Sequence, residues 1–274
     1  MLAKLMTDEW IERYSRQIIL PEIGAKGQAK LAEAKVLVIG AGGIGSPTAF
    51  YLVAAGVGKI GIVDSDDVEL SNLQRQILHS KSDIGRPKVA SAKERLEALN
   101  PDIEVIPHPV RFTSENIMDI LVDYDIVVDG SDNFATRYLV NDACVLSGKP
   151  LVTGAVIGFE AQGTTIIPKE SACYRCIFPT PPPPGFAPSC REAGVIGTIC
   201  GVIGSVLATE VIKLILGKGD LLTSQLFLCN LFTMEFRKID LRRNPKCPVC
   251  GNNPTVTQLI DYEEFCRLSQ NEGN

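Results

Sequence analysis

Short apolar runs alternate with amphipathic stretches through the first 155 residues of the chain. The runs are rich in β-branched residues and cover residues 35–40, 59–64, 103–106, 125–129 and 150–153. The stretches between them repeat apolar or small residues at helical spacing, over residues 45–56, 86–99, 114–121 and 133–146. Such runs are typical of strands buried on both faces, and their alternation with helices favours a parallel sheet. We therefore predict an α/β fold with a doubly wound, mostly parallel, Rossmann-like sheet.

The pattern changes after residue 155. Residues 163–168, 225–230 and 233–240 are typical of antiparallel strands, and residues 197–216 are apolar on nearly all sides, as in a buried helix. The proline-rich residues 177–188 suit neither a helix nor a central strand. We expect them to form an extended connection, either a solvated spacer or the cover of a channel.

We divide the chain into three regions that form one compact domain. Residues 1–34 are an N-terminal helical arm, residues 35–155 a nucleotide-binding Rossmann-like region, and residues 156–274 a C-terminal region.

Composition and charge exclude several classes of protein. With 45% hydrophobic and 22% charged residues among 274, the chain has enough apolar material for a sizeable core. A net charge of −5 and the lack of a Lys/Arg block disfavour binding to nucleic acid or to an anionic membrane. The longest uncharged apolar stretch, residues 195–209, is shorter than the ~20 residues that span a bilayer. We expect a cytoplasmic protein.

A glycine-rich turn follows the first predicted strand. Gly40, Gly42 and Gly45 form a GxGxxG pattern that also contains Gly43, between a strand and a helix. Glycines there let a phosphate approach the backbone N–H groups at the start of the helix. Asp64 ends the next strand and is suitably placed to bind ribose hydroxyls. The pattern predicts a nucleotide site, for which NAD would be the usual ligand.

The residues after Asp64 favour a triphosphate over a dinucleotide. A triphosphate needs cations to offset its charge, and Arg75 and Lys88 can supply them. Further polar candidates are Asp66, Asn72 and Gln76. Asp132 follows the strand at 125–129, where a carboxylate can hold Mg²⁺ against the nucleotide. Alternatively, Asp132 only caps the helix that begins at residue 133.

Two CxxC pairs account for four of the nine cysteines. Cys173 with Cys176, and Cys247 with Cys250, together offer four thiolates, the ligand set of a closed structural Zn²⁺ site. Two redox-active dithiols are the alternative, but neither pair lies between a strand and a helix as that chemistry requires.

The chain resembles the MoeB/ThiF/HesA family over residues 7–266. The motifs that carry the resemblance are RYSRQI at residues 13–18, GAGGIGS at 40–46, SNLQRQ at 71–76, GRPK at 85–88, DGSDNFATR at 129–137, CYRC and CPVC. Members are bacterial relatives of ubiquitin-activating enzymes. They adenylate the C-terminal glycine of a small ubiquitin-like sulfur-carrier protein ending in Gly-Gly, and release pyrophosphate.

The resemblance implies a role for each of these positions. Asp132 matches a catalytic aspartate linked to Mg²⁺, and Arg75 and Lys88 match cations that bind ATP. Asn72 and Gln76 match further nucleotide contacts, and Asp64 matches the ribose ligand. Arg16 matches an arginine that is donated across a homodimer interface into the neighbouring ATP site.

Cys190 matches a cysteine that some family members use in a covalent intermediate, although others carry it without requiring it. Cys200 has no equivalent that we recognise, and we expect it in the core. The chemistry needs no general base, because a carboxylate is already ionised at neutral pH. We therefore give no catalytic role to His79, expected at a helix end, or to His108, expected in a loop.

The carrier could serve molybdopterin, thiamine or another sulfur pathway, and we expect the sulfur donor to be a separate protein. Three alternatives stay open. The glycine pattern alone would suit an NAD-dependent oxidoreductase. A relative that adenylates tRNA is disfavoured by the acidic composition, and an inactive scaffold by the complete set of charged site residues.

Overall fold

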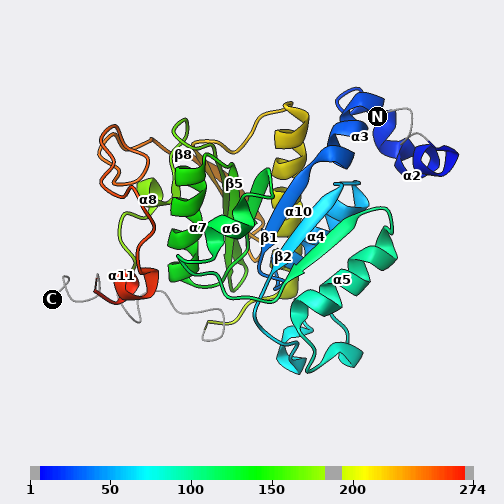
Figure 1. Cartoon of the computed structure of the whole chain (residues 1–274), viewed down its shortest axis with the longest axis horizontal. Coiled ribbons are helices and arrows are strands. Elements are labelled where there is room, and N and C mark those ends of the chain that lie inside the picture. Colours follow the sequence, from blue (N-terminus) through cyan, green and yellow to red (C-terminus); the bar gives the residue numbers. More distant parts are fainter. Residues whose placement is uncertain (1–6, 183–192, 269–274) are drawn as a thin grey trace.

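The computed structural model describes residues 7–182 and 193–268, and its centre is an eight-stranded mixed sheet (Figure 1). Five parallel strands come first: β1 (Lys35–Ile39), β2 (Lys59–Val63), β3 (Glu104–His108), β4 (Ile126–Asp129) and β5 (Leu151–Ile157). Three antiparallel strands follow: β6 (Glu160–Ile166), β7 (Gln225–Asn230) and β8 (Glu235–Asp240). The order across the sheet is β3-β2-β1-β4-β5-β6-β7-β8, which confirms the predicted fold class.

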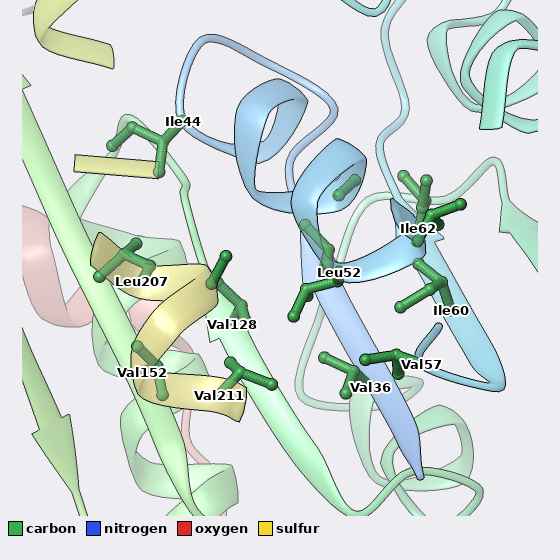
Figure 2. Packing of buried hydrophobic residues seen from close by; sticks show 14 of the residues in the cluster. Val36, Ile44, Leu52, Val57, Ile60, Ile62, Val128, Val152, Leu207 and Val211 are labelled. Carbon is green, nitrogen blue, oxygen red and sulfur yellow. The ribbon is translucent and has the colours of Figure 1, made fainter. Parts of the chain in front are cut away.

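Helices cover both faces of the sheet. The core on one face includes residues of α4 (Gly45–Ala54), α5 (Lys88–Leu99) and α10 (Gly197–Leu216). The core on the other face includes residues of α6 (Ile117–Leu121) and α7 (Phe134–Ser147). Successive side chains of a strand point to opposite faces, so Val36 and Val38 of β1 join the first core while Leu37 joins the second. Figure 2 shows Leu207 and Val211 of α10 close to Val128 and Val152 of the sheet.

The predicted N-terminal arm consists of α2 (Asp8–Ile18) and α3 (Gly24–Glu33). Trp10 and Tyr14 are the buried residues of α2, and Asn100 Nδ2 donates a hydrogen bond of 2.8 Å to the Tyr14 hydroxyl. Leu31 of α3 is fully buried in the core that also contains residues of α4 and α10. Both helices are therefore anchored to the rest of the fold.

The helix α10 has the bounds that the sequence predicts and is a core helix. Its length and composition alone would allow it to cross a membrane, which is weak evidence because core helices share these properties. It contacts β5, β6 and α4. Its buried Glu210 accepts hydrogen bonds from Thr165 Oγ1 at 2.6 Å and from the Leu222 N–H at 2.7 Å.

Several element ends differ from the sequence-based expectations. The helix expected at 86–99 begins at Lys88, because Pro87 precedes it with extended backbone. The strand expected at 103–106 is β3, which continues to His108, so the expected loop position of His108 was wrong. This strand tolerates Pro107 because it lies at the edge of the sheet. The expectation that His79 ends a helix was also wrong, since it follows a series of turns.

The described part of the C-terminal half contains two further short helices. They are α8 (Tyr174–Ile177), which follows Cys173 and contains Cys176, and α11 (Tyr262–Leu268), which contacts α7. Two 3₁₀ helices, Leu70–Asn72 and Lys81–Asp83, flank the segment that contains His79.

Candidate active site

A cavity of about 790 Å³ opens at the carboxyl ends of the parallel strands. It is lined by the turns that follow β1, β2 and β4 and by parts of β5 and β6. The chain proceeds in one direction across the sheet from β1 to β3 and in the other direction from β4 onward. Open α/β sheets bind ligands at such a reversal of strand order.

The glycine turn forms one wall of this cavity through Gly40, Gly42 and Gly43. Gly40 has a φ of +90°, a conformation that suits glycine. Gly45 is not a lining residue: a Cβ placed on it would lie 1.7 Å from the Gly40 carbonyl oxygen. Its role is thus to let α4 approach the turn. Among the residues that the structure describes, no side chain caps the N-terminus of α4, which leaves backbone N–H groups available for an anion.

Asp64 connects the end of β2 to the glycine turn. Its Oδ2 accepts a hydrogen bond from the Ala41 N–H and its Oδ1 one from the Asp66 N–H, both at 2.9 Å. Burial raises the pKa of Asp64, and the nearby Lys88 ammonium and these two hydrogen bonds oppose that rise. Asp64 lines the cavity, so its position fits the predicted contact to ribose.

The two predicted cations also line the cavity. Lys88, 6% exposed at the start of α5, places Nζ 2.9 Å from Asp66 Oδ2 and 3.9 Å from Asp64 Oδ1. Arg75 lines the cavity and donates to the Ser71 carbonyl at 3.0 Å. Gln76 is buried, and its Oε1 has no hydrogen-bond partner among the described residues.

Asp132 is exposed and lines the cavity in the turn after β4. The capping alternative for this residue was wrong: Asn133 caps α7 by accepting a hydrogen bond from the Thr136 N–H at 2.9 Å. The carboxylate of Asp132 therefore has no role in starting that helix. Carboxylate oxygens at this edge of the sheet suit a divalent cation bound to a phosphate.

Sequence reasoning missed Arg137, a buried residue in the wall of the cavity. Its guanidinium donates to the Gly154 carbonyl at 3.0 Å and to the Ser131 carbonyl. It thereby connects β5 to the turn that carries Asp132. The sequence motif at residues 129–137 contains this arginine. Local periodicity could not show that the Arg137 side chain contacts the turn that carries Asp132.

Besides Gly45, two more of the predicted site residues that the structure describes, Asn72 and Arg16, do not line the cavity. Asn72 is buried and its Oδ1 accepts the Glu69 N–H at 3.0 Å, so its amide stabilises a 3₁₀ turn. Arg16 is exposed on α2. Cys190 and residues 183–188 of the proline-rich segment lie outside the described residues. Cys200 is buried as expected, and it also lines the cavity beside Gly43.

The four CxxC cysteines form a second candidate site. Their Sγ atoms lie within 4.8 Å of one another, with 3.6 Å between Cys173 and Cys247 and 3.4 Å between Cys176 and Cys250. A tetrahedral zinc with Zn–S bonds of about 2.3 Å would hold its sulfurs about 3.8 Å apart. The sulfurs are too far apart for a disulfide bond. Hydrogen bonds within the cluster, chiefly with Cys173, lower the pKa of Cys176, whereas the pKa of Cys173 and that of Cys250 are raised.

A buried ion pair joins this cluster to the C-terminal helix. Arg175, between the first two cysteines, binds Asp142 of α7 at 2.8 Å, and both side chains are almost completely buried. The Tyr262 hydroxyl donates to the same carboxylate at 2.8 Å. The Arg175 guanidinium also lies over the ring of Phe265, 4.5 Å from its centroid. The contacts of α8 thus extend from the cysteines to α11.

Comparison with known proteins shows the family of this chain. Residues 14–249 match the ThiF family. The chain belongs to the ThiF family. It is 54% identical over 267 residues to a Thermus thermophilus sulfur carrier protein adenylyltransferase, covering 96% of this chain and 98% of that protein. It is 52% identical to the adenylyltransferase and sulfurtransferase MOCS3 of Culex quinquefasciatus, covering 97% of this chain but 61% of that protein.

The fold also matches a solved structure. The crystal structure of E. coli MccB with AMPCPP and MccA superposes with a TM-score of 0.77 at 26% identity, covering 91% of this chain and 76% of that one.

Proposed function

We propose that this ThiF-family protein is an ATP-dependent adenylyltransferase for a small ubiquitin-like sulfur carrier. The observation that carries the proposal is the cavity itself. It combines an uncapped helix N-terminus, the cations Lys88 and Arg75, and the exposed carboxylate of Asp132. The 54% identity with a sulfur carrier protein adenylyltransferase supports the same activity.

The reaction joins the carrier's terminal carboxylate to the α-phosphorus of ATP and releases pyrophosphate. Both reactants are anions, so their repulsion and alignment dominate the barrier. Lys88, Arg75 and the N–H groups of the glycine turn would hold the phosphates and offset their charge. Asp132 would hold Mg²⁺, which when bound neutralises charge on the phosphate oxygens. The attacking carboxylate is already ionised, so no side chain has to remove a proton.

The remaining assignments belong to the same proposal. The four clustered cysteines fit a structural Zn²⁺ site, because four protein sulfurs leave no coordination position for a substrate. We propose a homodimer in which Arg16 reaches the neighbouring ATP site, since within one chain Arg16 does not line the cavity. A ubiquitin-like carrier ending in Gly-Gly would enter past residues of β5 and β6, and a separate protein would donate sulfur. A covalent role for Cys190 and a cytoplasmic location stay predictions.

The cations also support ATP over NAD as the ligand. Lys88 now binds Asp66, and a triphosphate would compete with that carboxylate for the ammonium. A thermal-shift comparison separates the two ligands: ATP with Mg²⁺ should raise the melting temperature, and NAD should not. Stabilisation by NAD alone would contradict the proposal.

Carrier-dependent exchange of labelled pyrophosphate into ATP tests the activity. We would supply purified ubiquitin-like carriers of the molybdopterin and thiamine pathways, each with and without its terminal glycine. We expect exchange with at least one intact carrier and none with its truncated form. Asp132→Asn should abolish exchange, whereas Asp119→Asn, a matched change of an exposed aspartate on α6, should not. Full activity of Asp132→Asn would refute the assignment.

A further inference from the structure

A buried histidine lies against the glycine turn. His79 is 6% exposed, with Nε2 3.0 Å from the Ala41 carbonyl oxygen and Nδ1 2.9 Å from Ser91 Oγ. A carbonyl oxygen only accepts hydrogen bonds, so Nε2 carries the proton and Nδ1 accepts from the serine in the neutral ring. Burial lowers the pKa of His79, and the positive charge of Lys88 lowers it further. The hydrogen bond to the Ala41 carbonyl and the negative charges of Asp83 and Asp64 raise it and so oppose this shift. The tautomer is thus fixed by its surroundings.

Ala41 is held through both of its backbone polar groups. Its N–H donates to Asp64 at 2.9 Å, and its carbonyl accepts from His79. These two anchors matter because Ala41 lies between Gly40 and Gly42, and glycines allow neighbouring peptide units to rotate easily. Without the anchors, the turn would sample several orientations.

The orientation of the Ala41 carbonyl also sets that of the Gly42 N–H. Both belong to one planar peptide unit, and the described residues contain no cis peptide bond. In a trans unit the C=O and N–H point in opposite directions, so the Gly42 N–H points away from His79. Gly42 lines the cavity, and within the described part of the chain its N–H forms no backbone hydrogen bond.

We propose that His79 is a positioning residue that orients the Gly42 N–H toward a phosphate group of the bound nucleotide. The inference rests on the proposed function, because it assumes that the cavity binds a nucleotide phosphate. His79 acts through the Ala41 peptide and touches no substrate. Asp64 restrains the preceding peptide unit of the same turn.

Three substitutions separate positioning from structural support. In His79→Gln, the amide nitrogen can occupy the place of Nε2 and still donate to the Ala41 carbonyl. In His79→Asn, the shorter amide can reach Ser91 but not Ala41. His79→Leu removes both hydrogen bonds. We would measure the dissociation constant of Mg²⁺-ATP by calorimetry, the inhibition constant of adenosine, and the melting temperature of each variant.

We expect His79→Gln to bind ATP within about threefold of the wild type. His79→Asn and His79→Leu should bind it about tenfold more weakly, the effect of one hydrogen bond to a charged group. Adenosine has no phosphate, so its inhibition constant should stay unchanged in all three variants. The KM for ATP in pyrophosphate exchange should rise in parallel with the dissociation constant, and kcat should change less.

Two results would overturn the inference. One is equal weakening of ATP binding by His79→Gln and His79→Asn, and the other is equal weakening of ATP and adenosine binding. If either result is found while the wild-type chain still shows carrier-dependent pyrophosphate exchange, the role of His79 is refuted and the proposed function stands. A wild-type chain that bound no ATP would overturn both.

Discussion

Replacing Gly45 by alanine should destabilise the fold, whereas the same change at Gly42 should weaken ATP binding. A Cβ on Gly45 would lie 1.7 Å from the Gly40 carbonyl oxygen, a backbone atom that cannot rotate away. Relief of this overlap requires α4 or the glycine turn to move by more than about 1 Å in a closely packed core. Gly42 offers the matched control, because the nearest atom to its added Cβ would be Gln76 Nε2 at 3.8 Å.

Overpacking of a core costs about 1–3 kcal/mol in the free energy of unfolding, and a backbone overlap belongs at the upper end of that range. For a chain of this size, each kcal/mol lowers the melting temperature by about 2–4 °C, so Gly45→Ala should melt about 6–12 °C below the wild type. Gly42→Ala should melt within about 2 °C of it. Its methyl group would instead enter the cavity beside the phosphates and reduce ATP affinity about tenfold.

Differential scanning calorimetry and ATP titration of both variants would measure these effects. A wild-type melting temperature for Gly45→Ala would refute the close approach of α4 to the turn. Equal destabilisation by both substitutions would refute the division of roles between the two glycines.

Three further predictions concern stability. Arg175→Met should lower the free energy of unfolding by about 3–5 kcal/mol in chemical denaturation, because it leaves the Asp142 carboxylate buried without its cation; a loss below about 1 kcal/mol would contradict this. A chelator should lower the melting temperature and make four additional thiols reactive toward a thiol reagent if the clustered cysteines hold a metal, and an unchanged thiol count would argue against the site. Burial lowers the pKa of His79 and of His108 from 6.5, so the unfolded state binds more protons than the folded state just below pH 6.5. The free energy of unfolding should therefore fall as pH falls from about 7 toward 5, and less steeply in His79→Gln; identical pH profiles for the two proteins would exclude a contribution from His79.

Periodicity and glycine placement were enough to predict most of the fold. The helix at residues 197–216 has the predicted bounds, because its apolar run begins and ends at glycine. The alternation of strands and helices correctly gave the parallel part of the sheet. The first and last residues of helices and strands were harder to predict near a proline or a turn. For example, the helix expected from residue 86 begins after Pro87.

The grouping of the candidate site residues could be predicted where a residue type has one dominant use. The glycine turn, Lys88 and Asp132 come together at one edge of the sheet, and the two CxxC pairs meet although about 70 residues separate them. His79 and Arg137 instead form hydrogen bonds to backbone carbonyls of other elements. No local pattern records such contacts, because any buried histidine or arginine needs a partner of some kind.

Transfer of labelled oxygen tests the central claim most directly. A carrier whose terminal carboxylate contains ¹⁸O would be activated by the wild-type chain with Mg²⁺-ATP, and sulfide would then release AMP. Attack of the carboxylate on the α-phosphorus predicts one ¹⁸O atom in the AMP, detected by mass spectrometry. AMP that contains no ¹⁸O, with the label retained in the carrier, would contradict the proposed chemistry.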